Sequence, residues 1–150
     1  MDLKLLPPLT MALFGSAMYL LNRFLPFGTF DFFGRQTMAY VLMIMAIVIT
    51  AIALFQFSKA KTTTDPINPD KTTSLVTEGI YRFTRNPMYL ALLLVLVAFG
   101  LILGNAFNVL LAAGFVYYMN RFQIKKEEVA LSNRFGKTYA LYCKATRRWF

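Results

Sequence analysis

The stretch TEGIYRFTRNPMYLALLL, from Thr77 to Leu94, changes character halfway along. Its first half is a polar turn with two arginines, and its second half is uncharged and apolar. Asn86 is a favoured residue at a helix N-cap and Pro87 at the first helical position, so a helix is expected to begin here. The pattern therefore places Arg85 at the mouth of an apolar helix.

Apolar runs of this kind recur along the chain, whose 150 residues are 57% hydrophobic and 16% aromatic. Uncharged runs of about 18 residues or more predict membrane helices. Three runs qualify, namely Leu5 to Asn22, Gln36 to Ser58 and Asn86 to Asn120. The third is too long for one span, and Gly104-Asn105 near its middle is a helix-ending pair, which predicts two short helices joined by a tight hairpin.

These runs predict a single-domain, all-α membrane protein with about four transmembrane helices and further cytoplasmic helices in the C-terminal tail. The expected spans are roughly 5–22, 37–57, 87–103 and 106–121. The first two spans would occupy residues 1–58. The remaining residues, 59–150, would hold a binding loop, the helical hairpin and the tail.

Basic residues gather on one side of this topology. Residues 121–150 carry eight Lys and Arg and residues 58–85 carry five, whereas the first loop carries only Arg23 and Arg35. The positive-inside rule makes the basic side cytoplasmic, with both termini inside. Contacts with anionic membrane lipids explain the basic excess, and no nucleic-acid-binding motif accompanies it. No cleavable signal peptide is expected, because the first apolar run lacks a basic leader and a small-residue cleavage site.

The helix mouth at Arg85 has two interpretations. It is either a plain helix start or a receptor for a small anionic group, since free N–H groups and a positive dipole end meet Arg82 and Arg85 there. Gly79 would let the backbone approach a ligand closely. Tyr81 and Tyr89 are either interfacial anchors or flat faces for that ligand.

The tail segment IKKEEVALSNRF, residues 124–135, carries an acidic residue on its apolar face when drawn as a helix. That residue is Glu128, and Glu127 lies at the edge of the same face. A carboxylate on a packing face must find a cation or hydrogen-bond donors. Two roles stay open: an ion pair to Arg82 or Arg85, or a grip on the ammonium or hydroxyl of a ligand.

The rest of the tail is expected to be helical from Arg121, with a break near Gly136. The ending YALYCKATRRWF predicts a helix at the membrane interface. Its arginines either extend their charged ends to water or orient an anionic substrate group. Cys143 is expected to be inert. The chain has no histidine and one cysteine, which excludes histidine-based acid–base chemistry and a zinc site. No P-loop or dinucleotide-binding glycine pattern occurs. An enzyme built this way would act mostly by positioning a reactive cosubstrate.

Two segments in order, SLVTEGIYRFTRNPMYL at 74–90 and EEVALSNRFGKTYALYCKATRRW at 127–149, resemble the isoprenylcysteine carboxyl methyltransferase-like family of integral membrane methyltransferases, in its short prokaryotic type. The resemblance runs from about Asn68 to Trp149. It implies S-adenosylmethionine as cosubstrate and a cofactor pocket at the cytoplasmic face, between the turn before the hairpin and the tail. It also implies a lateral tunnel for a lipophilic acceptor and a bacterial or archaeal cytoplasmic membrane.

Carried over by position, the resemblance implies three catalytic residues, Arg148, Glu128 and Asn86, with Arg148 near the acceptor. It further implies a cofactor-binding set and no metal ligands. In this set the residues that would line the cofactor are Leu75, Val76, Gly79 and Tyr81. Those that would cap it are Arg85, Asn86, Pro87 and Tyr89. Its polar end would be fixed by Glu127 and Glu128.

Two departures from the family pattern are visible. Asn86 stands where many relatives have histidine and cannot take up a proton at neutral pH, and Thr73 stands where relatives often have His or Gln. The acceptor stays open among an isoprenylcysteine-type carboxylate, a thiol and a phospholipid amine. Two rival functions are considered. A membrane reductase using a nicotinamide dinucleotide needs more binding surface than 150 residues offer. A non-enzymatic small membrane protein would leave the acidic residue on the apolar helix face unexplained.

Overall fold

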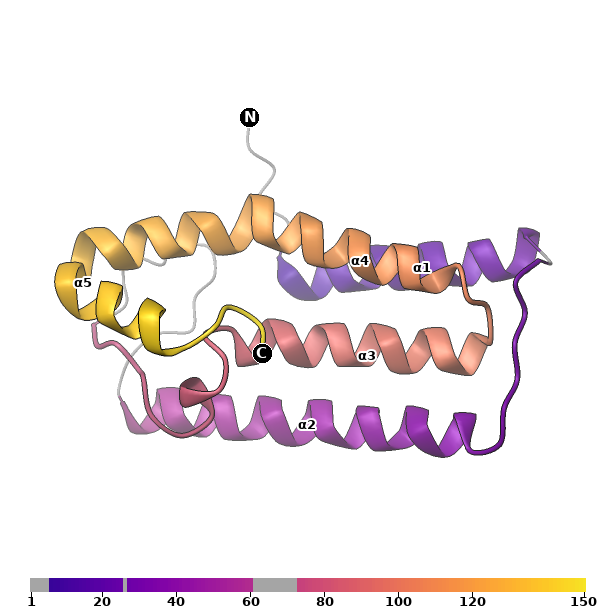
Figure 1. Cartoon of the computed structure of the whole chain (residues 1–150), viewed down its shortest axis with the longest axis horizontal. Coiled ribbons are helices and arrows are strands. Elements are labelled where there is room, and N and C mark those ends of the chain that lie inside the picture. The colour runs from indigo at the N-terminus through magenta and orange to yellow at the C-terminus, as the bar shows by residue number, and fades with distance from the viewer. Residues whose placement is uncertain (1–5, 26, 61–72) are drawn as a thin grey trace.

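The computed structural model describes residues 6–25, 27–60 and 73–150. In these ranges the regular elements are helices, and turns and loops join them; one isolated antiparallel bridge links Thr29 and Asn105. Figure 1 shows α3 lying between α2 on one side and α1 with α4 on the other. The elements in chain order are α1 (Pro7–Phe24), α2 (Arg35–Lys59), the 3-10 helix η2 (Gly79–Arg82), α3 (Pro87–Leu103), α4 (Asn108–Tyr118), the π-helical η3 (Met119–Ile124) and α5 (Lys125–Ala145).

The all-helical fold class is confirmed, whereas the number of membrane spans is not. Among the described residues, α2 is long and apolar enough to cross a bilayer, and α3 is apolar but only 17 residues long. The count of four spans therefore stays a prediction.

The predicted boundaries hold best where proline and glycine mark them. Helix α3 begins at Pro87 and ends at Leu103, and Gly104 caps it in the left-handed conformation at φ 67°. Helix α2 extends two residues beyond its expected range at each end, and α1 ends at Phe24, two residues late. The expected first residue of α1, Leu5, lies outside the described residues.

The predicted fourth helix, 106–121, was wrong at both ends. It begins at Asn108, because the Asn105 side chain accepts the Phe107 amide at 3.0 Å and holds the preceding residues in a turn. It does not stop at residue 121, since no helix breaker stands there. Instead η3 carries the helix on into α5, with the expected break inside α5 at Gly136, whose φ and ψ are 49° and −121°.

Small side chains let α2 and α3 approach closely. Ala39, Ala46 and Ala53 recur every seventh residue of α2 and are buried, as are Ala91 and Ala98 of α3. Small residues at helix interfaces permit close backbone contact in membrane bundles, where lipid provides no hydrophobic drive.

A larger cluster joins α1, α3 and α4. Met18, Leu96 and Phe115 are fully or almost fully buried in it, and Phe14 meets Phe115 edge to face at 5.8 Å between ring centroids. The outer faces of the helices, in contrast, expose many large apolar side chains, among them Tyr40, Ile44, Ile47, Phe55, Val109 and Tyr117. Such a surface suits lipid rather than water.

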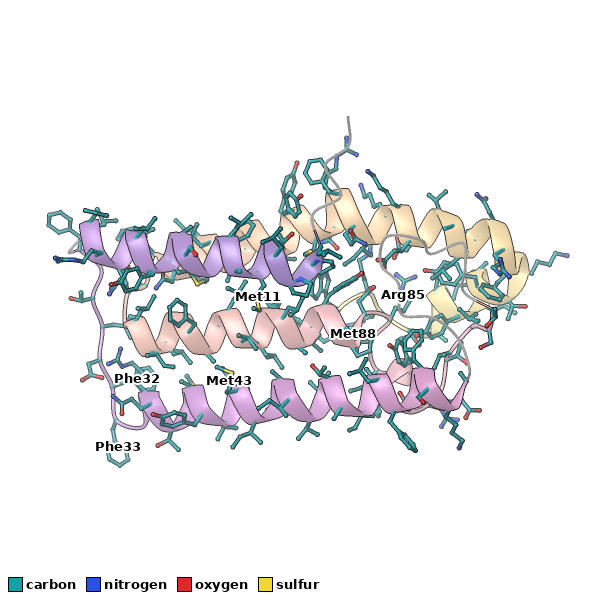
Figure 2. The ribbon with its side chains drawn as sticks, turned by 180° about the vertical axis from the view of Figure 1, so that it is seen from behind. Met11, Phe32, Phe33, Met43, Arg85 and Met88 are labelled. Carbon is teal, nitrogen blue, oxygen red and sulfur yellow. The ribbon has the colours of Figure 1, made fainter. Side chains whose placement is uncertain are left out.

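The end of the bundle opposite the tail is closed by the α1–α2 loop. Arg35 donates to the carbonyl of Leu101 at 2.9 Å, and Asn105 donates to the carbonyl of Phe27 at 3.0 Å, so the loop is tied to the hairpin turn. Figure 2 shows Phe32 and Phe33 at this end and Arg85 at the other. Phe33 is fully exposed, as expected of an interfacial aromatic belt.

Candidate functional site

The turn before α3 lies beside the last residues of the chain. Residues 146–149, here called the C-terminal strap, are non-helical and follow the end of α5, with Thr146 in an extended conformation. The carbonyl of Arg148 accepts two hydrogen bonds from the turn, one from the Thr84 hydroxyl at 3.2 Å and one from the Asn86 side-chain amide at 2.9 Å. The site is therefore built from segments more than 60 residues apart in the sequence.

Two more hydrogen bonds extend this pairing. The Arg85 amide donates to the carbonyl of Arg147 at 3.0 Å, and the Thr146 hydroxyl donates to the carbonyl of Arg82 at 3.3 Å. Four bonds thus fix the strap against the turn, one between backbone groups and three from side chains to backbone carbonyls.

The π-helical segment η3 anchors the strap from the other side. Asn120 accepts the indole N–H of Trp149 at 3.0 Å, and Trp149 also packs on the core. One turn further on, Gln123 donates to Glu127 at 2.6 Å. A π-bulge inserts an extra residue into a helix and often occurs at functional sites, and here it sets the direction in which α5 presents its acidic residues.

Glu128 lies between two arginines. Arg148 binds it through two parallel hydrogen bonds, Nε to Oε1 at 2.9 Å and Nη2 to Oε2 at 2.6 Å. Arg85 adds an ion pair from Nη2 at 3.3 Å and donates from Nη1 to the Cys143 sulfur. The hydrogen bonds to Glu128 raise the pKa of the Arg148 guanidinium, so this arginine stays charged.

Glu127, the next residue, has a different environment. Its Oε1 accepts hydrogen bonds from the Tyr89 hydroxyl and from Gln123, both neutral donors. Burial raises the pKa of its carboxyl to about 7, and the nearby charge of Glu128 contributes in the same direction, although the two hydrogen bonds oppose the shift. A carboxyl with this pKa is poised to gain or lose a proton near neutrality.

A cavity of about 480 Å³ opens between these elements. This volume lies within the range of small-molecule sites, about 300–1,000 Å³. Nine of the ten residues predicted to bind a cofactor line it: Leu75, Val76, Tyr81, Arg85, Asn86, Pro87, Tyr89, Glu127 and Glu128.

The tenth residue, Gly79, does not line the cavity. It has a left-handed φ of 60°, and a Cβ there would fall 1.4 Å from the side-chain nitrogen of Gln56. The left-handed φ favours glycine at this position, and any larger side chain would also have to displace the end of the Gln56 side chain. Arg148 is likewise not among the lining residues and reaches the cavity only through Glu128.

Sequence reasoning missed part of the lining. The start of α1, two positions of α2 and two tyrosines of α5 also contribute, namely Leu6, Pro7 and Pro8; Thr50 and Phe57; Tyr139 and Tyr142. The residues of α1 and α2 carry no local signal, because apolar positions in a span look alike whether they face lipid or a cavity. The tyrosines were visible but were assigned to the membrane interface.

The tyrosines around the cavity are kept neutral. Burial, as the largest cause, raises the pKa of the Tyr81, Tyr139 and Tyr142 phenols above the ordinary value. Tyr142 donates its hydroxyl to the carbonyl of Tyr81 at 2.7 Å, and Phe57 meets the Tyr81 ring edge-on at 5.4 Å. These groups thus offer flat faces and hydroxyl donors rather than charge.

Two local expectations need correction. Asn86 occupies the N-cap of α3, but its side chain makes no capping bond and holds the strap instead. The chain ending is not helical as far as Trp149, because α5 stops at Ala145 and Thr146 is extended. A third expectation, an inert Cys143, stays a prediction, and the structure adds that its sulfur accepts a hydrogen bond from Arg85.

Comparison with known proteins shows the family of this chain. The sequence profile described as phospholipid methyltransferase matches residues 34–138, which is more than half of the chain and includes both carboxylates but not the strap. A protein of Haemophilus influenzae described only as uncharacterized is 45% identical over 62 residues, which cover 41% of this chain and 98% of that protein. No solved structure matches. By its profile match and by the motifs that meet at this cavity, the chain belongs to the phospholipid methyltransferase family, within the isoprenylcysteine carboxyl methyltransferase-like membrane enzymes.

Proposed function

We propose that this protein is an S-adenosylmethionine-dependent methyltransferase that methylates a lipophilic acceptor at the cytoplasmic face of a membrane. The observation that carries the proposal is the shared cavity. Both family motifs, one before α3 and one in α5, contribute charged and aromatic side chains to the same space of about 480 Å³. Arg85 from the turn and Glu128 from α5 pair with each other in this space, and both also line the cavity, where they can face a ligand.

The side chains present fit the polar part of the cofactor, which is a zwitterion. Its carboxylate matches Arg85, whose Nε is buried and has no acceptor among the described residues. Its ammonium matches Glu128, which faces the same cavity. The aromatic faces of Tyr81 and Phe57 suit a purine ring.

When bound, S-adenosylmethionine supplies a methyl group that is already activated by its sulfonium charge. The protein then needs no metal, and its main task is to hold donor and acceptor in line. Such positioning contributes about 7–11 kcal/mol to lowering a barrier. Arg148, held by Glu128 and by the strap, is proposed to orient the acceptor, and Asn86 is proposed to hold the strap in place.

The acceptor is proposed to come from the bilayer, since the family name refers to phospholipids. Apolar residues from the start of α1 and from α2 line the cavity beside the charged ones. With four spans and both termini in the cytoplasm, the cavity lies at the cytoplasmic surface of a prokaryotic membrane. A lipid headgroup could then reach it while the acyl chains stay in the bilayer.

Calorimetric titration in detergent tests this proposal. S-adenosylhomocysteine, the product form of the cofactor, is titrated into the purified protein beside NADPH. Binding of S-adenosylhomocysteine alone supports the methyltransferase. Binding of NADPH alone would favour the reductase, and binding of neither would favour a non-enzymatic membrane protein.

A further inference from the structure

Two tyrosines near the end of α5 line the cavity with their rings at an angle to each other. Gly136 breaks α5, and Figure 1 shows the helix turning back there, so that its last turns lie beside the turn before α3. Tyr139 and Tyr142 stand on these last turns, and both line the cavity. Their ring centroids are 6.3 Å apart and their planes are inclined by 59°, so the rings form two sides of a corner rather than a parallel stack.

Each of these tyrosines is close to a different end of the site. The phenol of Tyr139 lies within the influence of the charges of Arg85 and Glu128, the proposed receptors for the carboxylate and the ammonium of the cofactor. Tyr142 donates its hydroxyl to the carbonyl of Tyr81, whose ring is proposed to hold the purine. In S-adenosylmethionine the sulfonium joins these two ends. A cofactor held at both ends would therefore carry its sulfonium along the wall that Tyr139 and Tyr142 form.

The charged groups of the cavity do not by themselves attract a sulfonium. Glu128 already holds two guanidinium groups, from Arg85 and Arg148, so two positive charges face one negative charge beside Tyr139. The amino-acid end of the cofactor is neutral overall and leaves this balance unchanged. Attraction for the sulfonium must then come in part from uncharged groups, and an aromatic face supplies it, because the ring quadrupole is negative over the face.

The two phenols are kept in the uncharged form that this role needs. Burial raises the pKa of both hydroxyls, and the nearby charge of Arg85 opposes the shift to a smaller extent. Each tyrosine therefore offers a ring face and a hydroxyl rather than a formal charge. Tyr139 is only 5% exposed, and a contact between a cation and a ring face is stronger when water is excluded from it.

We propose that Tyr139 and Tyr142 form an aromatic wall that binds the sulfonium of the methyl donor and distinguishes this charged donor from its neutral product. The inference rests on the proposed function. When the methyl carbon forms its bond to the acceptor, the electron pair of the C–S bond stays on sulfur, which becomes an uncharged thioether. The attraction to the two ring faces is lost at that moment, which favours release of the product over release of the donor.

The test compares the affinities for S-adenosylmethionine and S-adenosylhomocysteine, which differ by the methyl group and by the charge on sulfur. Calorimetry in detergent gives both affinities for wild type, Tyr139→Leu and Tyr139→Phe. Tyr117→Leu is the matched control, because Tyr117 is an exposed tyrosine of α4 that does not line this cavity. We expect Tyr139→Leu to weaken S-adenosylmethionine binding about tenfold more than S-adenosylhomocysteine binding, as for the loss of one desolvated cation–π contact. The ratio of the two affinities should stay near that of wild type in Tyr139→Phe, which keeps the ring, and in the control.

A second series keeps the shape of the ring and changes only its charge distribution. Phenylalanine and then increasingly fluorinated phenylalanines are incorporated at position 139, since fluorine withdraws electron density from the ring face. The affinity for S-adenosylmethionine divided by that for S-adenosylhomocysteine should fall stepwise with the number of fluorine atoms. A ring that acts by packing alone should give a constant ratio. This series also decides the question if Tyr139→Leu does not fold.

The same fluorinated series is the test at position 142. Tyr142→Phe also removes the hydrogen bond to the carbonyl of Tyr81, so this variant, and not wild type, is the reference there. A stepwise fall of the affinity ratio at position 142 would support the proposed wall, and a constant ratio would remove Tyr142 from it.

Two results would overturn the inference while leaving the proposed function intact. One is a constant affinity ratio across the fluorinated series at position 139, with Tyr139→Leu weakening both ligands equally. The other is a change of the ratio in Tyr139→Phe as large as that in Tyr139→Leu, which would assign the contact to the hydroxyl and not to the ring face. If wild-type protein binds neither S-adenosylmethionine nor S-adenosylhomocysteine, the proposed function itself fails.

Discussion

Neighbouring residues of the same type acquire different properties from their contacts alone. Glu128 reaches two arginines and becomes part of an ion-pair network, whereas Glu127, one position earlier, reaches a phenol and an amide. Helical geometry explains the difference, because consecutive residues point about 100° apart and meet different neighbours. Single substitutions at these two positions should therefore have different effects.

Glu128→Gln and Arg85→Ala should each abolish detectable S-adenosylhomocysteine binding while the protein stays folded in detergent. Removing one member of a desolvated charge pair typically weakens binding by about 2–5 kcal/mol, because its partner is left unpaired. Calorimetry gives the affinity, and circular dichroism with a melting curve reports folding. Full affinity in both variants, with Glu78→Gln as control, would refute the assignment of the site.

The buried carboxyl of Glu127 should make the protein less stable as the pH rises. Its pKa in the folded state is about 7, against an ordinary value of 4.5, so the folded state binds this proton more tightly than the unfolded state. This tighter proton binding adds fully to the free energy of unfolding below about pH 4.5, and its contribution is lost as the pH rises through 7. The free energy of unfolding falls by at most about 1.4 kcal/mol per pH unit.

The measurement is the melting temperature of wild type and Glu127→Gln between pH 5 and pH 8. The melting temperature of wild type minus that of the variant should fall across this interval. Subtracting the two melting temperatures cancels the contributions of the other titrating groups. A difference that does not change with pH would mean that Glu127 titrates near its ordinary value.

At the scale of elements, the C-terminal strap decides whether the site exists. The strap is only four residues long, yet four hydrogen bonds join it to the turn before α3. Trp149 anchors its end on η3. Without the strap, Arg148 would have no fixed position and Glu128 would lose its two-point partner.

Asn86→Ala should loosen the strap, because it removes the side-chain donor to the Arg148 carbonyl. We expect trypsin to cleave after Arg147 or Arg148 several times faster in this variant, and S-adenosylhomocysteine affinity to fall. Mass spectrometry of the C-terminal fragments during limited proteolysis gives the rate. Thr84→Val, which removes the other side-chain bond to the same carbonyl, should act in the same direction.

An unchanged cleavage rate in both variants would show that the remaining contacts of the strap, including Trp149 and the Arg148–Glu128 pair, are enough to hold it. Lys144→Gln is the matched control for protease access, since it alters an exposed basic residue beside the strap without touching these bonds.

At the scale of the whole molecule, charge and apolar surface are separated along the long axis. Figure 1 shows α5 and η2 at one end of the bundle and the α1–α2 loop with the hairpin turn at the other. The first end carries most of the basic residues and the cavity, and the second carries exposed phenylalanines. A bilayer across the bundle would put these ends on opposite sides.

This orientation can be checked by labelling. In a Cys143→Ser background, Phe33→Cys and Lys137→Cys each introduce one exposed cysteine, at opposite ends of the bundle. An impermeant maleimide should label Phe33→Cys in intact bacterial spheroplasts and Lys137→Cys only after permeabilisation. Labelling of both from outside would contradict the proposed cytoplasmic position of the tail.

Much of the fold could be predicted because its signals are local. Pro87 and Gly104 mark α3 at both ends, and the break at Gly136 follows from glycine alone. The fourth helix was misjudged, since its start depends on a side-chain bond from Asn105 and its continuation on a π-helix without a composition signature.

An all-helical apolar chain, a basic end and two family motifs, with an acid on an apolar helix face, are all visible in the amino-acid sequence. These features depend on composition and on periods of a few residues. Three features depend on tertiary packing: the strap closes on the turn, Glu128 pairs with Arg85 and Arg148 and not with Arg82, and Glu127 has neutral partners. The physical reason is distance along the chain: these contacts join residues some 20 to 65 positions apart, and their formation depends on how α3, η3 and α5 pack, which no local pattern records.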